Sequence, residues 1–218
     1  MLLYDENRIV VDVNLPKIKW DWSTCHEASH RILVWHRPYF YGDTAQTLDP
    51  DWHEILESEA NYGASALMFC GTVFTREACD TAKNWASVMA LKKRYGKSLT
   101  TTLRRYVEHG HDHAMVMLVS TPYWLEKHED QPTRCRHFVR SNKFAEQFGA
   151  VEPEQILAVV DANSTERRGG PVANFIFAFD DDNGVSHEFN IETFYNGHYN
   201  LTLCVHVQKC TAKRIIVP

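Results

Sequence analysis

The sequence has no long hydrophobic run, because none of its apolar stretches approaches the roughly 20 consecutive residues that a membrane-spanning helix requires. It also lacks a signal-peptide pattern, since its first residues, MLLYDE, do not place positive charges ahead of an apolar segment. From these two absences we expect a cytoplasmic protein that has no membrane partner.

Cysteine never occurs in a C-x-x-C pair, the spacing typical of thiolate zinc sites and of many redox-active sites. The six cysteines are scattered along the chain, at Cys25, Cys70, Cys79, Cys135, Cys204 and Cys210. This scatter argues against a disulfide framework and favours a reducing compartment.

Positive charge is not in excess, since 23 lysines and arginines stand against 28 aspartates and glutamates, for a net charge of -5. A chain without a basic field is not expected to bind nucleic acid directly. Its 218 residues, of which 44% are hydrophobic and 23% charged, suit a globular protein with one large domain or two small ones.

The most informative feature that is present is the H-E-x-x-H motif at His26-Glu27-Ala28-Ser29-His30. On a helix, the two histidines lie one turn apart on one face, so that both can bind the same zinc ion. Glu27 then lies where it can take a proton from a zinc-bound water. The motif predicts a metallopeptidase-type zinc site, although five residues can also arise by chance at a polar helix end.

Two positions compete for the third zinc ligand that a catalytic site normally has. His36 gives the histidine spacing of metzincins, but Leu33 stands where that motif has the glycine that turns the chain back. If the helix continued straight, His36 would lie about 15 Å along the axis from His26 and would miss the metal. A side chain that reaches solvent at the helix end is the alternative for His36.

Glu57 is the favoured third ligand, because it lies on the next predicted helix, as the glutamate of gluzincins does. Asn61 follows four residues later on the same helix face, where it can orient a ligand histidine from behind. Glu54 and Glu59 are the other candidate ligands. A solvated acidic helix face is the structural alternative for these glutamates.

The hydrophobic pattern predicts an α+β fold whose two halves differ in character. After a strand at 8–13, helices are expected from a cap within 21–24 to about 35, and at 52–67, 75–95 and 99–107. Strands are expected at 114–120, 136–140, 156–160, 174–179, 187–194 and 201–207, with turns at 181–184 and 196–197. We therefore divide the chain into a zincin-like helical domain, 1–107, and a sheet-rich antiparallel region, 108–218, that shapes substrate access or senses a signal.

Residues 20–107 resemble the ImmA/IrrE family of zinc peptidases, which typically show H-E-L-G-H and then E-x-x-A-N-x-F-A-x-x-L-L-M-P. In this chain an E-x-x-A-N motif runs from Glu57 to Asn61, and ASALM follows at 64–68. The segments LKKRYGKSL at 91–99 and LRRY at 103–106 resemble a motif found later in the family's sequences, "la-x-x-F-x-V-S". The chain departs from the pattern where Ala28-Ser29 replaces Leu-Gly and where the final proline is missing.

The resemblance implies a gluzincin-like fold in which His26, His30 and Glu57 bind Zn²⁺ and Glu27 is the general base. It also implies a cytoplasmic protein of a bacterium, a mobile element or a phage. The implied partner is a protein substrate, a DNA-binding repressor of the helix-turn-helix kind, whose cleavage relieves transcription during a stress response.

Other readings stay open. The chain could be a non-catalytic regulator that uses a zincin fold to bind a protein partner or DNA, or a zinc hydrolase of non-peptide substrates. Retention of Glu27 favours an enzyme, because a merely structural site needs ligands but no base. His109, His111 and His113 alternate and could share a metal on a strand, although Gly110 and Asp112 favour a turn.

Overall fold

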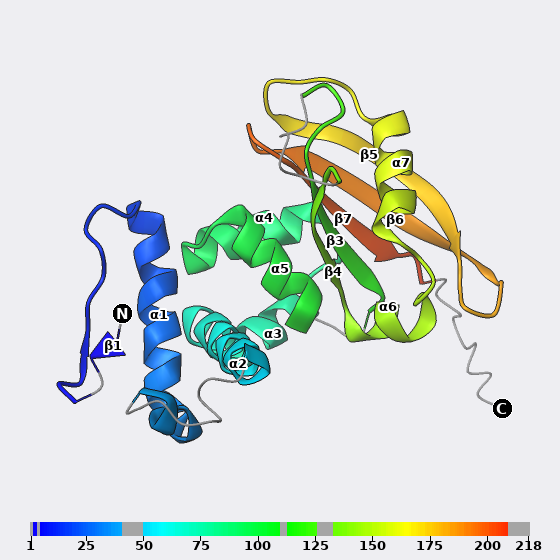
Figure 1. The fold of residues 1–218 in the computed structure, drawn as a ribbon. Coiled ribbons are helices and arrows are strands. Elements are labelled where there is room, and N and C mark those ends of the chain that lie inside the picture. Colours follow the sequence, from blue (N-terminus) through cyan, green and yellow to red (C-terminus); the bar gives the residue numbers. More distant parts are fainter. Residues whose placement is uncertain (1, 4, 41–49, 110–112, 126–132, 209–218) are drawn as a thin grey trace, which may run out of the picture. The chain divides into compact units, whose positions relative to one another are not determined.

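The computed structural model describes residues 2–3, 5–40, 50–109, 113–125 and 133–208. Its helices and its antiparallel sheet confirm the α+β class (Figure 1). Contacts divide the chain into two compact units, which we call the N-terminal unit (Met1–Glu77 with Tyr95–Ser98) and the sheet unit (Ala78–Arg94 with Leu99–Pro218). Among the described residues, no helix combines the length and the apolar character that a membrane span requires.

The N-terminal unit begins with a two-stranded sheet and is otherwise helical. Its elements are β1 (Leu2–Leu3), β2 (Arg8–Ile9), α1 (Lys17–Ile32), the 3-10 helix η1 (Val34–Phe40), α2 (Pro50–Met68) and most of α3 (Thr72–Cys79). The strand predicted at 8–13 is shorter than expected, because β2 pairs only with the two residues of β1 and a turn follows at Asp12. Helix α1 begins earlier than expected, because Pro16 occupies its N-cap position and precedes the first turn.

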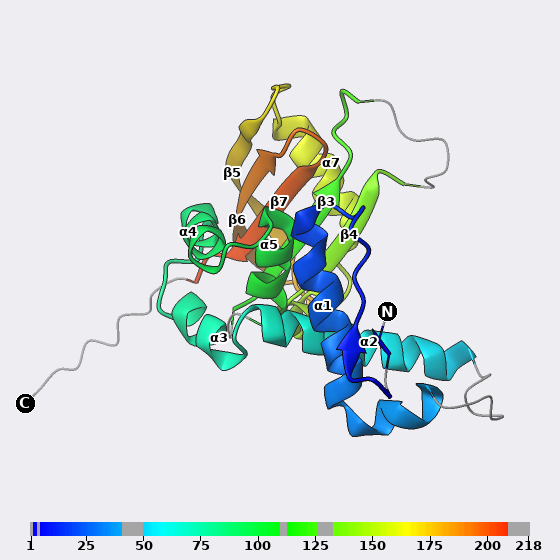
Figure 2. The same ribbon diagram turned by 90° about the vertical axis from the view of Figure 1, so that its left-hand side faces the viewer.

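Helices α1 and α2 contact each other closely (Figures 1 and 2). The buried residues Leu56, Ala60 and Ala64 are spaced by four along α2, so they form one stripe on that helix. Two of the three are alanines, which leave little side chain between α2 and what it packs against. This close packing brings the polar residues beside the stripe near the H-E-x-x-H motif of α1.

The sheet unit contains a five-stranded antiparallel sheet in the order β4-β3-β7-β6-β5. Its strands are β3 (Met115–Ser120), β4 (Cys135–Arg140), β5 (Gly170–Asp180), β6 (Ser186–Tyr195) and β7 (Asn200–His206). The two turns predicted around 181–184 and 196–197 join β5 to β6 and β6 to β7. Helix α5 (Leu99–His109) contacts β3 and β4 from one side, while α6 (Asn142–Gln147) and α7 (Pro153–Asn163) cover the other (Figures 1 and 2).

Two sequence predictions of elements are wrong, and one further helix was not predicted. Residues 156–160 form part of α7 and not a strand, because Pro153 begins the helix and Glu152 and Gln155 form a capping box. The short helix α6 has no counterpart among the predicted elements. The helix predicted at 75–95 is divided into α3 and α4 (Trp85–Tyr95), and between them the Lys83 ammonium donates to the carbonyls of Ala78, Cys79 and Thr81.

The division by contacts also differs from the boundary expected between residues 107 and 108. Helix α5 belongs to the sheet unit and contacts β3 and β4. Its residues Leu103, Tyr106 and Val107 are buried. Most of α4 is in the same unit, where Trp85 packs against Phe194 of β6. Helix α1, which carries the H-E-x-x-H motif, thus belongs to one unit and the helices that pack on the sheet to the other.

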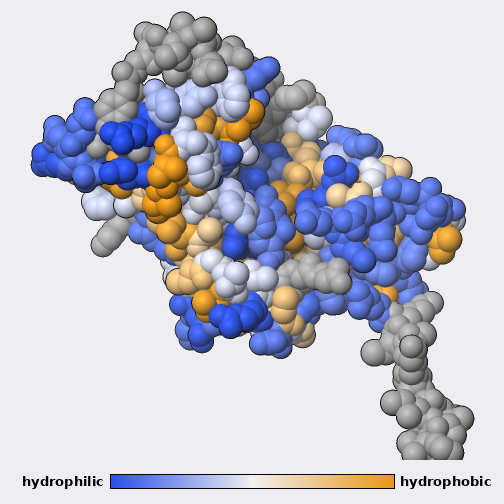
Figure 3. Space-filling model, turned by 90° about the horizontal axis from the view of Figure 1, so that it is seen from below, coloured by the Kyte–Doolittle hydropathy of each residue, from blue (hydrophilic) through white to orange (hydrophobic). Residues whose placement is uncertain are grey.

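Hydrophilic residues predominate on the face of the molecule shown in Figure 3. The hydrophobic residues on that face form several small groups and no single continuous patch. No apolar docking surface therefore stands out on this face.

Candidate metal centre

The H-E-x-x-H motif lies on helix α1, as expected. His26 and His30 are one turn apart, and their Nε2 atoms are 3.2 Å from each other. Both Nε2 atoms face α2, where Glu57 reaches them with its two carboxylate oxygens. Oε2 is 3.2 Å from His26 Nε2, and Oε1 is 3.4 Å from His30 Nε2.

These three side chains form the one group of histidine, cysteine, aspartate or glutamate side chains in the described residues whose arrangement could hold a metal ion. Their ligand atoms all lie within 4.8 Å of one another. Of the alternative ligands, Glu59 contacts other side chains and neither Glu54 nor His36 is in the group. The structure therefore brings together the three residues favoured from the sequence.

The kinds of donor atom and the histidine spacing fit zinc. His26 Nε2 and His30 Nε2 are 3.2 Å apart, close to the roughly 3.3–3.4 Å that separates two ligands held at 2.0–2.1 Å in tetrahedral directions. Each imidazole meets a different oxygen of Glu57, His26 meeting Oε2 at 3.2 Å and His30 meeting Oε1 at 3.4 Å. Two imidazole nitrogens and one carboxylate oxygen are also a ligand set of catalytic zinc sites, which leave the fourth position open.

Asn61 contacts the first ligand histidine from behind. Its Oδ1 lies 3.1 Å from His26 Nδ1, the nitrogen that faces away from Glu57. An amide oxygen only accepts, so His26 carries its proton on Nδ1 when this bond forms and keeps Nε2 unprotonated. This is the orienting contact expected of Asn61 from its spacing to Glu57.

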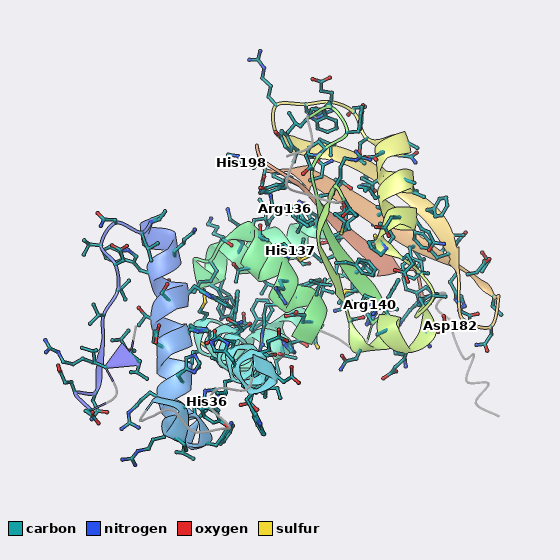
Figure 4. All side chains as sticks on the ribbon, viewed as in Figure 1. His36, Arg136, His137, Arg140, Asp182 and His198 are labelled. Carbon is teal, nitrogen blue, oxygen red and sulfur yellow. The ribbon has the colours of Figure 1, made fainter. Side chains whose placement is uncertain are left out.

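His36 contacts His30 on the ring nitrogen that faces away from Glu57, which the sequence did not predict. Its Nδ1 is 2.8 Å from His30 Nδ1, and its Nε2 is 2.8 Å from Glu59 Oε2. The side chain is fully buried, so the expected solvent-reaching position is wrong. Figure 4 labels His36 where η1 follows the end of α1.

The chain turns at Leu33 without the glycine that the metzincin motif uses there. Leu33 caps α1 in an extended conformation, with φ -77° and ψ 93°, and its N–H donates to the Ser29 carbonyl. Helix η1 then returns the chain so that His36 faces His30. The prediction of a straight helix to about residue 35 is therefore wrong, and His36 stays outside the metal group because it meets Nδ1 of His30 and not Nε2.

The environment of the site favours neutral imidazole at His30. Burial lowers the pKa of His30, the neighbouring His26 lowers it further, and the carboxylate of Glu57 opposes the shift. A neutral ring keeps a lone pair on Nε2 for a metal. The Glu57 side chain is 41% exposed, so the donor set is open to solvent at that ligand.

Glu27 follows His26 on α1 and is half-buried. Its charge is among the influences that raise the pKa of His30, although burial, which lowers that pKa, is the largest. The Glu27 carboxylate therefore lies within electrostatic range of His30 without belonging to the metal group.

The remaining histidines considered from the sequence lie in the sheet unit. His109 ends α5, and the alternating pattern at 109–113 cannot be followed further because residues 110–112 lie outside the described residues. His187 and His206 meet edge to face, with ring centroids 5.1 Å apart. His198, labelled in Figure 4, belongs to the turn before β7, where its N–H donates to the Asn196 side chain.

Comparison with known proteins gives a similarity in fold. No protein-family model matches the sequence, and no curated protein does. A Mycobacterium tuberculosis transcriptional regulator of known structure is similar, with a TM-score of 0.50 at 11% sequence identity. The similarity covers 95% of this chain and 62% of the regulator's chain, so this chain spans less than two thirds of that protein's length.

Proposed function

We propose that the protein is a zinc-dependent metallopeptidase similar to the ImmA/IrrE family, with a zincin-like arrangement of α1 and α2. The observation that carries the proposal is the grouping of His26, His30 and Glu57, whose ligand atoms all lie within 4.8 Å of one another. Glu27, one residue after the first ligand, adds the base that a purely structural site does not need.

The chemistry follows from where these side chains lie. Zinc at this site would supply Lewis acidity for the scissile carbonyl and lower the pKa of an attacking water toward about 7. Glu27 would take the proton of that water and then deliver it to the leaving amine. Asn61 would hold the His26 ring so that the Nε2 atom of His26 faces His30 and Glu57. The solvent-exposed side of Glu57 would leave room for a peptide to approach.

The departures from the family pattern have structural counterparts that support this proposal. Ser29 stands where the family has glycine, and Gly63 stands opposite it where the family has phenylalanine, so a larger residue on α1 is matched by a smaller one on α2. Cys70 stands where the family has proline and has φ +56°, which a proline ring cannot adopt. The residues that pack between α1 and α2 thus differ from the family pattern, whereas the residues proposed to bind the metal match it.

The proposed substrate is a DNA-binding repressor of the helix-turn-helix kind, encoded beside this protein and cut in the cytoplasm. The test is to incubate that repressor with the zinc-loaded protein and identify new peptide termini by mass spectrometry. We expect cleavage by the parent, and a loss of about 10²–10⁴-fold or more in Glu27→Gln, whose amide cannot take the proton. Equal cleavage by Glu27→Gln would contradict the mechanism.

The second candidate function is a non-catalytic regulator that binds a protein partner or DNA through the same fold. The structure similar in fold at 11% sequence identity is described as a transcriptional regulator, which is the reason for considering this role. A zinc-loaded parent that binds the repressor or DNA but leaves both intact would favour this alternative. Glu27→Gln would then bind as well as the parent, since binding needs no base.

A further inference from the structure

The two ligand histidines are held from behind by different kinds of partner. His26 meets the side chain of Asn61, which is exposed and neutral. His30 meets the buried ring of His36, which in turn meets the carboxylate of Glu59. Only the contact between His30 and His36 leads on to a charged group, the Glu59 carboxylate.

The hydrogen-bond partners determine which ring nitrogen carries the proton in His36 and in His30. An ionised carboxylate only accepts, so the 2.8 Å contact between Glu59 Oε2 and His36 Nε2 requires the His36 proton on Nε2. In a neutral His36 ring, Nδ1 is then an acceptor, and its 2.8 Å contact with His30 Nδ1 requires the His30 proton on Nδ1. His30 Nε2 is left without a proton, and this is the atom that faces His26 and Glu57.

Because both rings are buried, a change of tautomer would be energetically costly. The His36 side chain has no exposed surface and that of His30 is 6% exposed, so water cannot readily replace either partner. A buried ring nitrogen that loses its hydrogen-bond partner is left with the full cost of its desolvation. The opposite tautomer of His30 would place two unprotonated Nδ1 atoms 2.8 Å apart.

Glu59 is itself held in place by a second donor. The indole Nε1 of Trp35 lies 2.6 Å from the same oxygen, Oε2, that accepts from His36. Trp35 and His36 are neighbours on η1, whereas Glu59 belongs to α2. The pair of bonds therefore ties η1 to α2 behind His30.

We propose that His36 and Glu59 are positioning residues that act through His30, fixing its ring orientation and its tautomer so that Nε2 is presented to the metal. The metal in this statement rests on the proposed function, whereas the tautomer of His30 does not. His36 is thus a member of the site without being the metzincin ligand that its spacing suggested. Contacts of this kind behind a ligand histidine typically change metal affinity by 10–100-fold.

Three variants of His36 separate its two bonds. His36→Asn places an amide oxygen near the position of Nδ1 and can still accept from His30. His36→Gln places its amide near Nε2 and keeps only the bond to Glu59, and His36→Phe removes both. Glu59→Gln removes the charge at the end of the relay, and Glu54→Gln, an exposed acid on the same helix outside the metal group, is its matched control.

The first readout is zinc affinity, measured by competition with a chromophoric chelator. We expect His36→Phe and His36→Gln to bind zinc about 10–100-fold more weakly, with His36→Asn between them and the parent. Glu59→Gln should weaken binding and Glu54→Gln should not. Equal affinity of the parent, His36→Phe and Glu59→Gln would overturn the proposal.

The second readout is the tautomer of His30, read from the ¹⁵N shifts of its ring by NMR in the metal-free protein. The parent should show a proton on Nδ1 and none on Nε2, and His36→Phe should show a mixture of both tautomers. A parent that binds no zinc but shows the Nδ1 proton would contradict the proposed function and support the relay. An unchanged tautomer in a folded His36→Phe variant would overturn the relay whatever the zinc result.

Discussion

Gly63 of α2 faces Ser29 of α1 with no room for a side chain between them. A Cβ atom at position 63 would lie 2.6 Å from Ser29 Oγ and 2.8 Å from Ser29 Cβ. Ser29 is next to the ligand His30, and Gly63 lies two residues after Asn61. This close approach therefore sets the distance between the two helices that carry the donor set.

Substitution Gly63→Ala should push α2 away from α1 and weaken zinc binding. Overpacking of this kind typically costs about 1–3 kcal/mol, which exceeds the roughly 1 kcal/mol that alanine gains over glycine in a helix. Ser29→Gly removes both atoms that the new methyl group would meet, so the double variant should regain much of the lost zinc affinity. Chelator competition measures the four proteins, and a double variant no better than Gly63→Ala would contradict the steric account.

The contact of Asn61 with His26 predicts a graded effect on zinc affinity. Asn61→Ala removes the acceptor 3.1 Å from His26 Nδ1 and should weaken binding about 10-fold or more. Asn61→Asp keeps an acceptor at that place and should bind zinc at least as well as the alanine variant. Ser58→Ala, an exposed position one turn away on α2, is the control and should match the parent. Identical affinities for all three variants would mean that Asn61 does not orient His26.

The sheet unit should lose stability when the pH falls from 7.5 to 5.5. Burial is the largest cause that lowers the pKa values of His109 and His206 below 6.5. As the pH falls through about 6.5, the unfolded chain therefore takes up protons first, and the free energy of unfolding decreases until the folded pKa values are passed. Urea midpoints measured with EDTA present should show this loss, and His206→Gln should show a smaller difference between the two pH values. A midpoint that is unchanged or higher at pH 5.5 would contradict the prediction.

A chain ended at residue 110 should be poorly soluble. The truncation keeps α5 but removes β3 and β4, which that helix contacts. Leu103, Tyr106 and Val107, which have no exposed surface in the full chain, would then face water. Size-exclusion chromatography of the truncated and full chains is the measurement. A monodisperse truncated chain would show that α5 does not depend on the sheet.

Much of the metal site could be predicted from sequence because its residues are close in sequence and lie on regular helices. The i, i+4 spacing of His26 and His30 fixes their common face, and the next helix supplies Glu57 and Asn61 at the same spacing. The place of His36 could not be predicted, because it depends on a turn that Leu33 makes without glycine. That turn gives no signal in the residue pattern.

The errors in the fold have similar local causes. Residues 156–160, ILAVV, read as a buried strand because an apolar β-branched run does not separate a strand from a buried helix. Pro153 and the Glu152–Gln155 capping box were the signals that favour a helix there. The sequence pattern does not show that α5 groups with the sheet, because its apolar face is covered through tertiary contacts with β3 and β4.

The most direct test of the account is a zinc titration of the metal-free protein, with X-ray absorption of the loaded form. We predict about one zinc ion per chain with nitrogen and oxygen ligands at about 2.0–2.1 Å. Binding should be lost in His26→Ala, His30→Ala and Glu57→Ala, and kept in Glu54→Ala and in Glu27→Gln, whose side chain is not a ligand. Zinc binding by His26→Ala or Glu57→Ala as tight as that of the parent would contradict the proposed site.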